Sequence, residues 1–213
     1  MSAFPADPDE VFAVALADAL CARLCHDLSS PLGSLMGALE VAVESPESTE
    51  EALSLASETA IEMAQRLRLL RAAWAGASGE MSAQALGELA TGLPKRVTVA
   101  LDGLGGGVFP APIARVLLNL MLLGAEALPN GGTIALSGAP DADMLVMVDG
   151  PNAAWPPGLV PALAGLRTMP DNARAVQAPL VAMLARTAGL RLSLLMPGGL
   201  AGPAAAPLLL SPG

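Results

Sequence analysis

The sequence is poor in aromatic and sulfhydryl side chains: its 213 residues include one histidine, two cysteines and no tyrosine. Aromatic residues make up 2% of the chain although 53% of it is hydrophobic, so the apolar mass is aliphatic. Such a composition favours helix-rich packing over an aromatic β core. Cys21 and Cys25 are one helical turn apart, which suits neither a disulfide framework nor a zinc site, and we expect them to be small core residues.

Basic residues are also scarce. Eleven Lys and Arg oppose twenty Asp and Glu, which gives a formal charge of −9 and an isoelectric point near 4.5. This balance argues against binding to nucleic acid or to an anionic membrane, because both require clustered cations. The longest apolar run, VLLNLMLLGAEAL, is too short to span a bilayer and contains Asn119 and Glu126. The acidic N-terminus does not resemble a secretory signal, so we expect a cytoplasmic protein.

The first third of the chain has apolar residues at helical spacing, in a first helix over 9–44 and a second one ending near 74. In the first helix the predicted buried stripe consists of Leu20, Leu24, Leu28, Leu32, Leu35, Leu39 and Ala42. In the second helix the predicted seam consists of Leu53, Ala56, Ala60, Met63, Leu67, Leu70 and Trp74. A two-helix hairpin cannot bury both stripes alone, so we expect a homodimer held by residues of about 10–75 as a four-helix bundle.

After a break at 75–80 the pattern changes to alternating strands and helices. Strands are predicted at 95–101, 133–138, 144–150, 191–196 and 206–210, with a turn at 102–107 and helices at 110–128 and 173–190. Pro179 should kink the last helix or shift its start. The predicted fold is therefore α + α/β. A helical hairpin domain occupies 9–76, and an α/β sandwich domain occupies 80–213.

His26, the one imidazole, lies two positions from Leu24 and from Leu28 on the predicted helix, so it points away from the buried stripe. On position alone a surface histidine without chemistry is an equal interpretation. Metal binding is disfavoured because no further ligands are at hand, and a Ser-His-Asp hydrolase because no nucleophile elbow is present. An exposed imidazole is a good nucleophile near neutral pH, and the adjacent Asp27 can hold its other N–H or accept its proton.

Polar side chains surround this position. Arg23 lies one turn before His26 and can steady a transferred phosphoryl group by charge-assisted hydrogen bonds. Ser30 and Ser34 continue the polar face, and the hairpin geometry brings Arg66 of the second helix to the same level. We therefore predict that Arg23, Ser30, Ser34 and Arg66 form the phosphoryl environment and contact an incoming receiver domain.

The box HDLSSP at 26–31 resembles the H-[ED]-x-x-[TN]-P phosphoacceptor box of sensor histidine kinases. The longer stretch RLCHDLSSPLGSL is similar to the start of ChpT-type histidine phosphotransferases. This resemblance implies that His26 is phosphorylated and that Asp27 is its acid/base neighbour. Ser30 departs from the pattern, which has Thr or Asn at that position.

The second half also resembles a kinase ATP-binding domain in the stretch RVLLNLMLLGAEALPNGGTIAL. Asn119 matches the first asparagine of the N-box, but the second one, a magnesium ligand in active kinases, is replaced by Leu123, which offers no oxygen to a hard cation. Asp149 matches the aspartate that binds adenine in these kinases. The glycine-rich motifs expected around this aspartate and after it are missing. The resemblance therefore implies a degenerate ATPase-like domain with no cofactor and no metal site.

Three hypotheses follow. The first is a phosphotransferase that relays a phosphoryl group between receiver aspartates through His26, with magnesium supplied by the receiver. By resemblance its partners are the receiver domain of a CckA-like hybrid kinase and regulators such as CtrA and CpdR. The second is a divergent ATP-dependent histidine kinase. The third is a non-catalytic dimeric scaffold that binds response regulators.

Overall fold

The computed structural model describes residues 7–75, 79–167, 172–195 and 205–213, which divide into two compact units. The first unit is Met1–Arg66 with Met169–Val176, and the second is Leu67–Thr168 with Gln177–Gly213. The break predicted at 75–80 includes residues 76–78, which lie outside the described residues. A helical hairpin followed by a mixed α/β domain confirms the predicted fold class.

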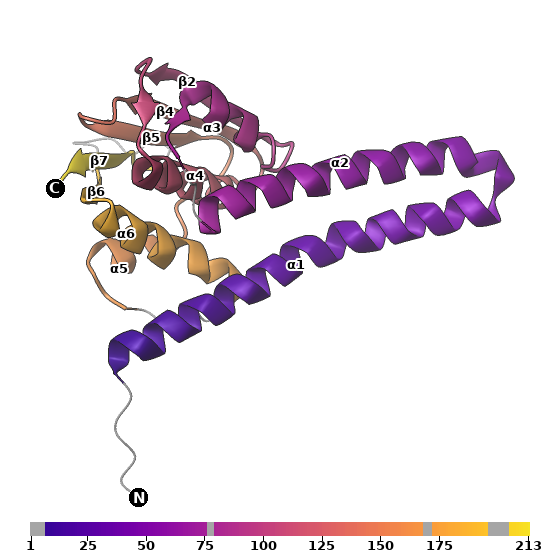
Figure 1. Ribbon diagram of the computed structural model, residues 1–213, viewed down its shortest axis with the longest axis horizontal. Coiled ribbons are helices and arrows are strands. Elements are labelled where there is room, and N and C mark those ends of the chain that lie inside the picture. Colours follow the sequence, from indigo (N-terminus) through magenta and orange to yellow (C-terminus); the bar gives the residue numbers. More distant parts are fainter. Residues whose placement is uncertain (1–6, 76–78, 168–171, 196–204) are drawn as a thin grey trace, which may run out of the picture. The chain divides into compact units, whose positions relative to one another are not determined.

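The first unit is built on two long helices, α1 (Pro8–Glu44) and α2 (Thr49–Trp74), joined by the 3-10 turn η1 (Pro46–Ser48) (Figure 1). Asp7 caps α1 by accepting a hydrogen bond from the backbone N–H of Asp9, and Pro8 occupies the first turn, where its missing N–H costs nothing. Thr49 ties the turn by donating its hydroxyl to the carbonyl of Ala42 at 3.0 Å. The cap at Asp7 and the hydrogen bond of Thr49 therefore fix the start of α1 and the turn between the two helices.

Within one chain the hairpin buries small side chains rather than leucines. The buried residues that face inward near the turn are Ala38, Ala52, Ala56 and Thr59. Several members of the predicted stripes are instead exposed, namely Leu32, Leu39, Leu53, Ala60 and Leu67. These stripes were predicted to be buried in a four-helix bundle of two chains, so their burial stays a prediction.

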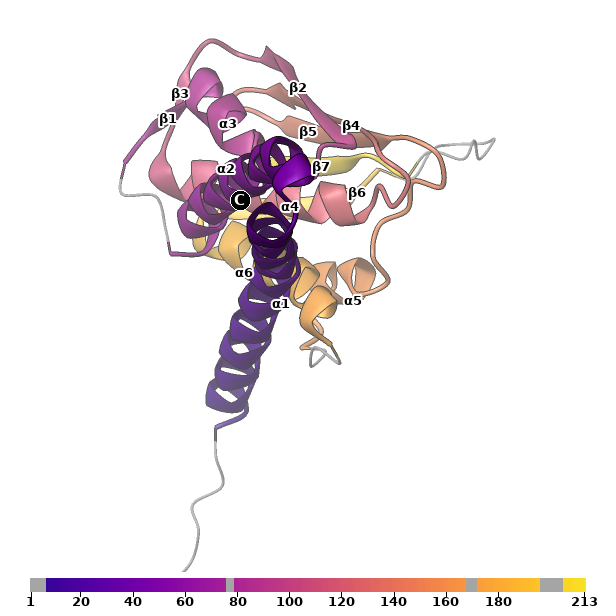
Figure 2. The same ribbon diagram turned by 90° about the vertical axis from the view of Figure 1, so that its right-hand side faces the viewer.

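The second unit has a five-stranded sheet in the order β2-β4-β5-β7-β6, in which only β2 and β4 run parallel. Its strands are β2 (Val97–Leu104), β4 (Gly132–Gly138), β5 (Met144–Asp149), β6 (Leu190–Leu194) and β7 (Leu208–Pro212). Its helices are α3 (Ala83–Ala90), α4 (Ala111–Glu126), α5 (Leu159–Leu163) and α6 (Gln177–Thr187). A small second sheet pairs β1 (Met81–Ser82) with β3 (Val108–Phe109). Figure 2 shows α4 and α6 on one side of the large sheet.

Alternation of side chains makes one face of this sheet apolar. Ile134 pairs with Val148, and Leu136 pairs with Val146, and all four side chains are at most 2% exposed. Helix α4 covers this face at close range. A Cβ added at Gly124 would lie 2.8 Å from Cδ1 of Ile134, so a larger residue there would push the helix off the sheet.

The strands and helices of this unit follow the predicted pattern with several differences. Strand β2 continues through Asp102–Leu104, which we expected to be part of a turn, by means of an irregularity between Ala100 and Gly103. Helices α3 and α5 and the short strands β1 and β3 were not anticipated. The last helix begins at Gln177 after the 3-10 turn η2 (Ala173–Val176), so that Pro179 sits in its first turn, where no intrahelical donor is needed.

A buried polar cluster attaches the end of α2 to the helices of this unit. Asn119 is fully buried, and its Nδ2 donates to the carbonyl of Ala73 and to that of Arg115, both at 2.8 Å. Arg115 donates from Nε to the carbonyl of Ala73 at 3.1 Å and from Nη2 to that of Trp74 at 2.5 Å. Gln177 of α6 donates to Oδ1 of Asn119 at 2.9 Å. These bonds satisfy the last carbonyls of α2, which have no partner inside the helix.

We predict that Asn119→Leu lowers the free energy of unfolding of the second unit by about 2–3 kcal/mol, because the change leaves buried polar groups without partners. Denaturant unfolding followed by tryptophan fluorescence measures this, since Trp74 and Trp155 both belong to this unit. The exposed amide variant Gln84→Ala is the control and should shift the value by less than about 0.5 kcal/mol. Equal stability of the two variants would contradict a structural role for Asn119.

Candidate functional site

Helix α1 presents His26 to solvent near its middle. The side chain of His26 is 60% exposed, whereas Leu24 and Leu28 on either side are half-buried. Successive residues of a helix are turned by about 100°, so positions two apart point in nearly opposite directions, as the sequence predicts. The imidazole is thus held on a rigid helix with its ring accessible to a partner molecule.

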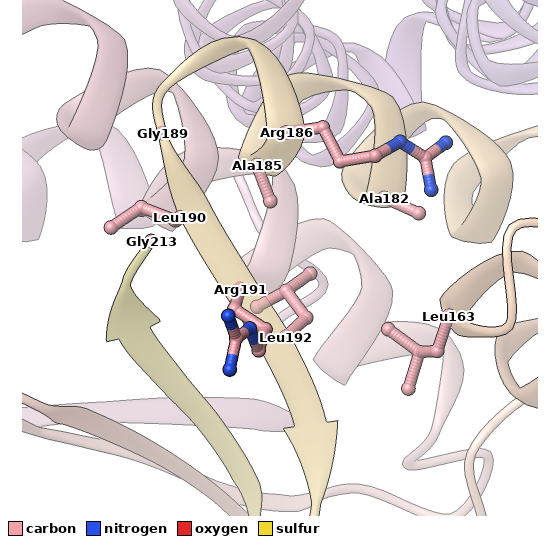
Figure 3. A pocket seen from close by; sticks show the side chains of 9 residues that line it. All are labelled: Leu163, Ala182, Ala185, Arg186, Gly189, Leu190, Arg191, Leu192 and Gly213. Atoms are coloured by element: carbon pink, nitrogen blue, oxygen red, sulfur yellow. The ribbon is translucent and has the colours of Figure 1, made fainter.

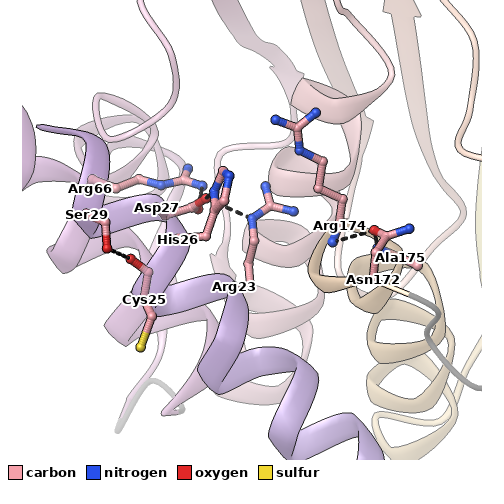
Figure 4. Close-up of polar contacts among 9 residues, drawn as sticks. All are labelled: Arg23, Cys25, His26, Asp27, Ser29, Arg66, Asn172, Arg174 and Ala175. Atoms are coloured by element: carbon pink, nitrogen blue, oxygen red, sulfur yellow. Dashed lines mark hydrogen bonds and ion pairs between the residues drawn. The ribbon is translucent and has the colours of Figure 1, made fainter.

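The carboxylate of Asp27 lies between two arginines, and only 13% of its side chain is exposed (Figure 4). Arg23, one turn earlier on α1, donates from Nε to Oδ1 at 2.9 Å. Arg66 of α2 donates from Nη2 to Oδ2 at 2.5 Å. Nδ1 of His26 lies 3.5 Å from Oδ1, which is longer than a hydrogen bond but close enough for a carboxylate to attract an N–H at that nitrogen.

The two arginines determine the ionisation of this carboxyl group. Burial of Asp27 acts to raise its pKa, but the hydrogen bond and charge of Arg66, together with the charge and hydrogen bond of Arg23, outweigh burial and hold the pKa below its ordinary value. Asp27 is therefore a carboxylate at neutral pH and serves as an acceptor. It has no proton to donate there.

The structure gives Arg23 and Arg66 a defined partner in Asp27, and their contact with a phosphoryl group or a receiver stays a prediction. Both bind Asp27, with side chains 13% and 19% exposed, and Arg66 does reach the level of His26 as expected from the hairpin. Ser30 and Ser34 are exposed on the same helix. The hydroxyl of Ser34 lies 3.4 Å from the carbonyl of Ser30, so it turns back along the helix rather than toward the imidazole.

Cys21 and Cys25 are exposed, and the prediction that they are core residues is wrong for this chain. Helical spacing alone placed them near the leucine stripe of α1, but their side chains are exposed in the single chain.

One element of the site escaped the sequence analysis. The 3-10 turn η2 returns from the second half of the chain and packs on α1 within the first unit. Oδ1 of Asn172 accepts the backbone N–H of Arg174 at 2.9 Å and that of Ala175 at 3.1 Å, which caps the turn. The exposed Arg174 is thereby placed on the Arg23 side of the site (Figure 4). The only signal in the sequence was an asparagine that could cap a turn.

The positions that match a kinase nucleotide site are occupied differently here. Asn119 is engaged in the buried cluster described above, and Leu123 is fully buried in α4. Asp149 is exposed at the end of β5, and α6 opens with Gln177 in place of a glycine box. Across the described residues no group of three or more His, Cys, Asp or Glu is placed to hold a metal ion. No helix in the described part of the chain is long and apolar enough to cross a membrane.

A second concave surface lies in the α/β unit, away from these positions (Figure 3). Leu163, Leu190 and Leu192 contribute to its apolar wall, and Arg186 and Arg191 stand on it. The two guanidinium groups point apart in Figure 3, so they do not converge on one anion. Nothing at this surface indicates a ligand.

The fold and the site together define a class: a helical hairpin that carries a solvent-exposed histidine next to an ionised carboxylate, joined to an α/β sandwich. The family model described as histidine phosphotransferase C-terminal domain matches residues 82–199, more than half of the chain. The chain therefore belongs to the histidine phosphotransferase family, and its resemblance to ChpT-type phosphotransferases is confirmed.

One solved structure agrees with this assignment. A bacterial phosphotransferase is 25% identical, with a TM-score of 0.74, and the match covers 93% of this chain and 96% of that one. The cytoplasmic segment of the histidine kinase QseC is 12% identical, with a TM-score of 0.37 and coverage of 74% and 92%, a similarity too low to carry an argument. No curated protein sequence matches this chain.

We predict that Asp27→Asn removes a pH-dependent part of the stability of the hairpin. Because the pKa of Asp27 is lowered in the folded state, its contribution of about 1–3 kcal/mol is complete above the unfolded value of about 3.9 and is lost as the pH falls through the folded pKa. Denaturant unfolding followed by far-ultraviolet circular dichroism at several pH values measures it. The wild type and the variant should differ at pH 7 and converge toward pH 2.

The matched control is Asp18→Asn, which changes an exposed carboxylate of the same helix. Its stability should follow that of the wild type across the pH series. If the free energies of unfolding of the wild type and Asp27→Asn differ by the same amount at every pH, the ion pairs of Asp27 do not stabilise the hairpin.

Proposed function

We propose that this protein relays a phosphoryl group between aspartates of receiver domains through a phosphohistidine at His26. The observation that carries the proposal is the exposure of the sole imidazole beside a buried, ionised carboxylate on a helix of a family member. The family supports the transferase class, and the exposed position of His26 beside Asp27 supports its assignment as the phosphorylated residue.

The geometry supports a simple exchange. Nε2 of His26 attacks the phosphorus of an aspartyl phosphate, the bond from phosphorus to the aspartyl oxygen breaks, and the receiver recovers its carboxylate. The proton on Nδ1 stays on the ring, which becomes cationic, and the carboxylate of Asp27 at 3.5 Å offsets that charge. The reverse reaction transfers the phosphoryl group from Nε2 to the aspartate of a second receiver. In both directions the chain contributes positioning and charge, and the receiver supplies its magnesium.

A direct reaction with ATP is not part of the proposal. Leu123 offers no oxygen where a kinase has a magnesium ligand, and Asn119 already donates to Ala73 and accepts from Gln177. Without the glycine boxes, the start of α6 does not expose a phosphate-binding loop. These features support a domain that retains the fold of the kinase ATPase without its chemistry.

A homodimer is the second part of the proposal. Large apolar side chains remain between 45% and 55% exposed along both helices of the hairpin, including Leu32, Met36, Leu39, Leu53, Leu55 and Ile61. A second copy that packs its hairpin against this one would bury them in a four-helix bundle. Leu32, Leu39 and Leu53 belong to the regular pattern that predicted a bundle from the sequence.

By resemblance, the phosphoryl donor would be the receiver domain of a CckA-like hybrid kinase, and the acceptors would be regulators such as CtrA and CpdR. Such partners operate in the cytoplasm, where we propose that this protein acts. The exposed face of His26 and the exposed serines of α1 are available to a docking receiver.

The relay predicts that radiolabel moves from a phosphorylated receiver onto the wild-type protein and does not move onto His26→Gln, because the amide is not a nucleophile that can carry the group. Gel autoradiography after brief mixing measures the transfer. Asp18→Asn is the control and should be labelled like the wild type. Labelling by ATP alone would favour the divergent kinase, and absence of any label with intact receiver binding would favour a scaffold.

The dimer predicts a solution mass of twice the chain mass of 21.3 kDa by light scattering at micromolar concentration. The double variant Leu39→Glu with Leu53→Glu should move the protein to the single-chain mass, since it places charges where the bundle would be apolar. Ser57→Glu, which adds a charge at an exposed polar position of α2, should leave the dimer intact. A wild type that elutes with the single-chain mass would overturn the proposal.

A further inference from the structure

Two of the four arginines of α1 and α2 converge on one carboxylate. Helix α1 carries Arg23, and α2 carries Arg66 together with Arg68 and Arg71. Arg23 and Arg66 bind the same carboxylate, that of Asp27, and all three side chains are less than 20% exposed. These partly buried pairs contribute to stability, and the way in which they hold the carboxylate also fixes its orientation beside His26.

The two oxygens of Asp27 have different neighbours. Oδ2 accepts only the hydrogen bond from Arg66 that reaches across from α2, at 2.5 Å. Oδ1 accepts from Arg23 at 2.9 Å and is the oxygen that faces Nδ1 of His26. Neighbouring residues on a helix do not normally face each other, so the side chain of Asp27 must be held to bring Oδ1 toward the preceding imidazole. The bond to Arg66 holds it from the opposite side.

We propose that Arg66 is a positioning residue of the phosphotransfer reaction. By anchoring Oδ2 from the second helix, it keeps Oδ1 beside Nδ1 of His26, which favours the tautomer with a proton on Nδ1 and leaves the lone pair of Nε2 for the phosphoryl group. The inference rests on the proposed relay, and it replaces the prediction that Arg66 contacts the receiver or the phosphoryl group.

The burial of Arg66 supports this role over direct contact. Its side chain is 19% exposed, against 60% for His26, and its Nη2 already donates a short hydrogen bond to the carboxylate. A guanidinium group that left Asp27 to bind a phosphoryl group would leave a largely buried carboxylate without this partner. The arrangement also makes the orientation of the nucleophile depend on the pairing of α1 with α2.

The first test uses the fact that the chain has a single histidine, so that one imidazole gives the whole histidine signal. Long-range ¹H–¹⁵N NMR at a pH where the ring is neutral reports which nitrogen carries the proton. We expect the wild type and Arg71→Met, a matched change of an exposed arginine on α2, to show mainly the Nδ1–H form. Arg66→Met should shift the population toward the Nε2–H form that free imidazole prefers, and Arg66→Lys should lie between the two.

The second test separates positioning from docking by transfer kinetics at varied concentrations of phosphorylated receiver. For Arg66→Met the maximal transfer rate should fall by about 10- to 100-fold, the effect of a misplaced catalytic group, while the half-saturating receiver concentration stays within about twofold. Arg66→Lys should recover part of the rate. Arg66→Gln is measured in parallel, so that a variant with a neutral donor is available if Arg66→Met does not fold.

Two results would overturn the inference. One is a wild-type tautomer population in folded Arg66→Met or Arg66→Gln, whatever happens to transfer. The other is a raised half-saturating concentration with an unchanged maximal rate, which would assign Arg66 to receiver contact. If the wild type accepts no label at all, the proposed relay itself fails. This outcome is distinct because it is seen with the wild type alone, without any variant of Arg66.

Discussion

The ion pair between Arg66 and Asp27 is the constraint on which the rest of the site depends. It joins two helices whose residues are far apart in the sequence, and it holds an ionised carboxylate in a largely buried position beside an exposed imidazole. The charge of the carboxylate is retained because the two arginines outweigh the cost of burial. The same interaction therefore contributes to helix pairing and to the electrostatic environment of the nucleophile.

In the α/β unit, a residue that matches a functional motif has a structural role. Asn119, which matches a nucleotide-site asparagine in sequence, points into a cluster that binds the last carbonyls of α2 and the amide of Gln177. Its neighbour in the motif, Leu123, belongs to the apolar face that packs in the core. Once a polar side chain is fully buried with its hydrogen bonds satisfied, removing it from that cluster costs free energy, so Asn119 contributes to stability by itself.

Much of the fold could be predicted because helices and strands have short sequence periods. The spacing of leucines predicted α1 and α2, and alternation such as that of Ile134 and Leu136 predicted the strands of the sheet. The buried face of a single hairpin was predicted only in part. Ala56 and Leu70 of the predicted seam are buried, whereas Ala38 and Ala52 are buried without belonging to the predicted stripes. The extension of β2 depends on pairing with β4, a distant segment.

The sequence by itself determined that one imidazole lies on the polar face of a long helix, next to an aspartate, in a box that resembles known phosphoacceptor sites. These features involve residues within one or two turns, whose relative directions follow from helix geometry alone. Only the tertiary structure decided that Arg66 binds Asp27 and that Asn119 binds Ala73. Those pairs are separated by 39 and 46 positions, and such partners are chosen by how the chain closes on itself.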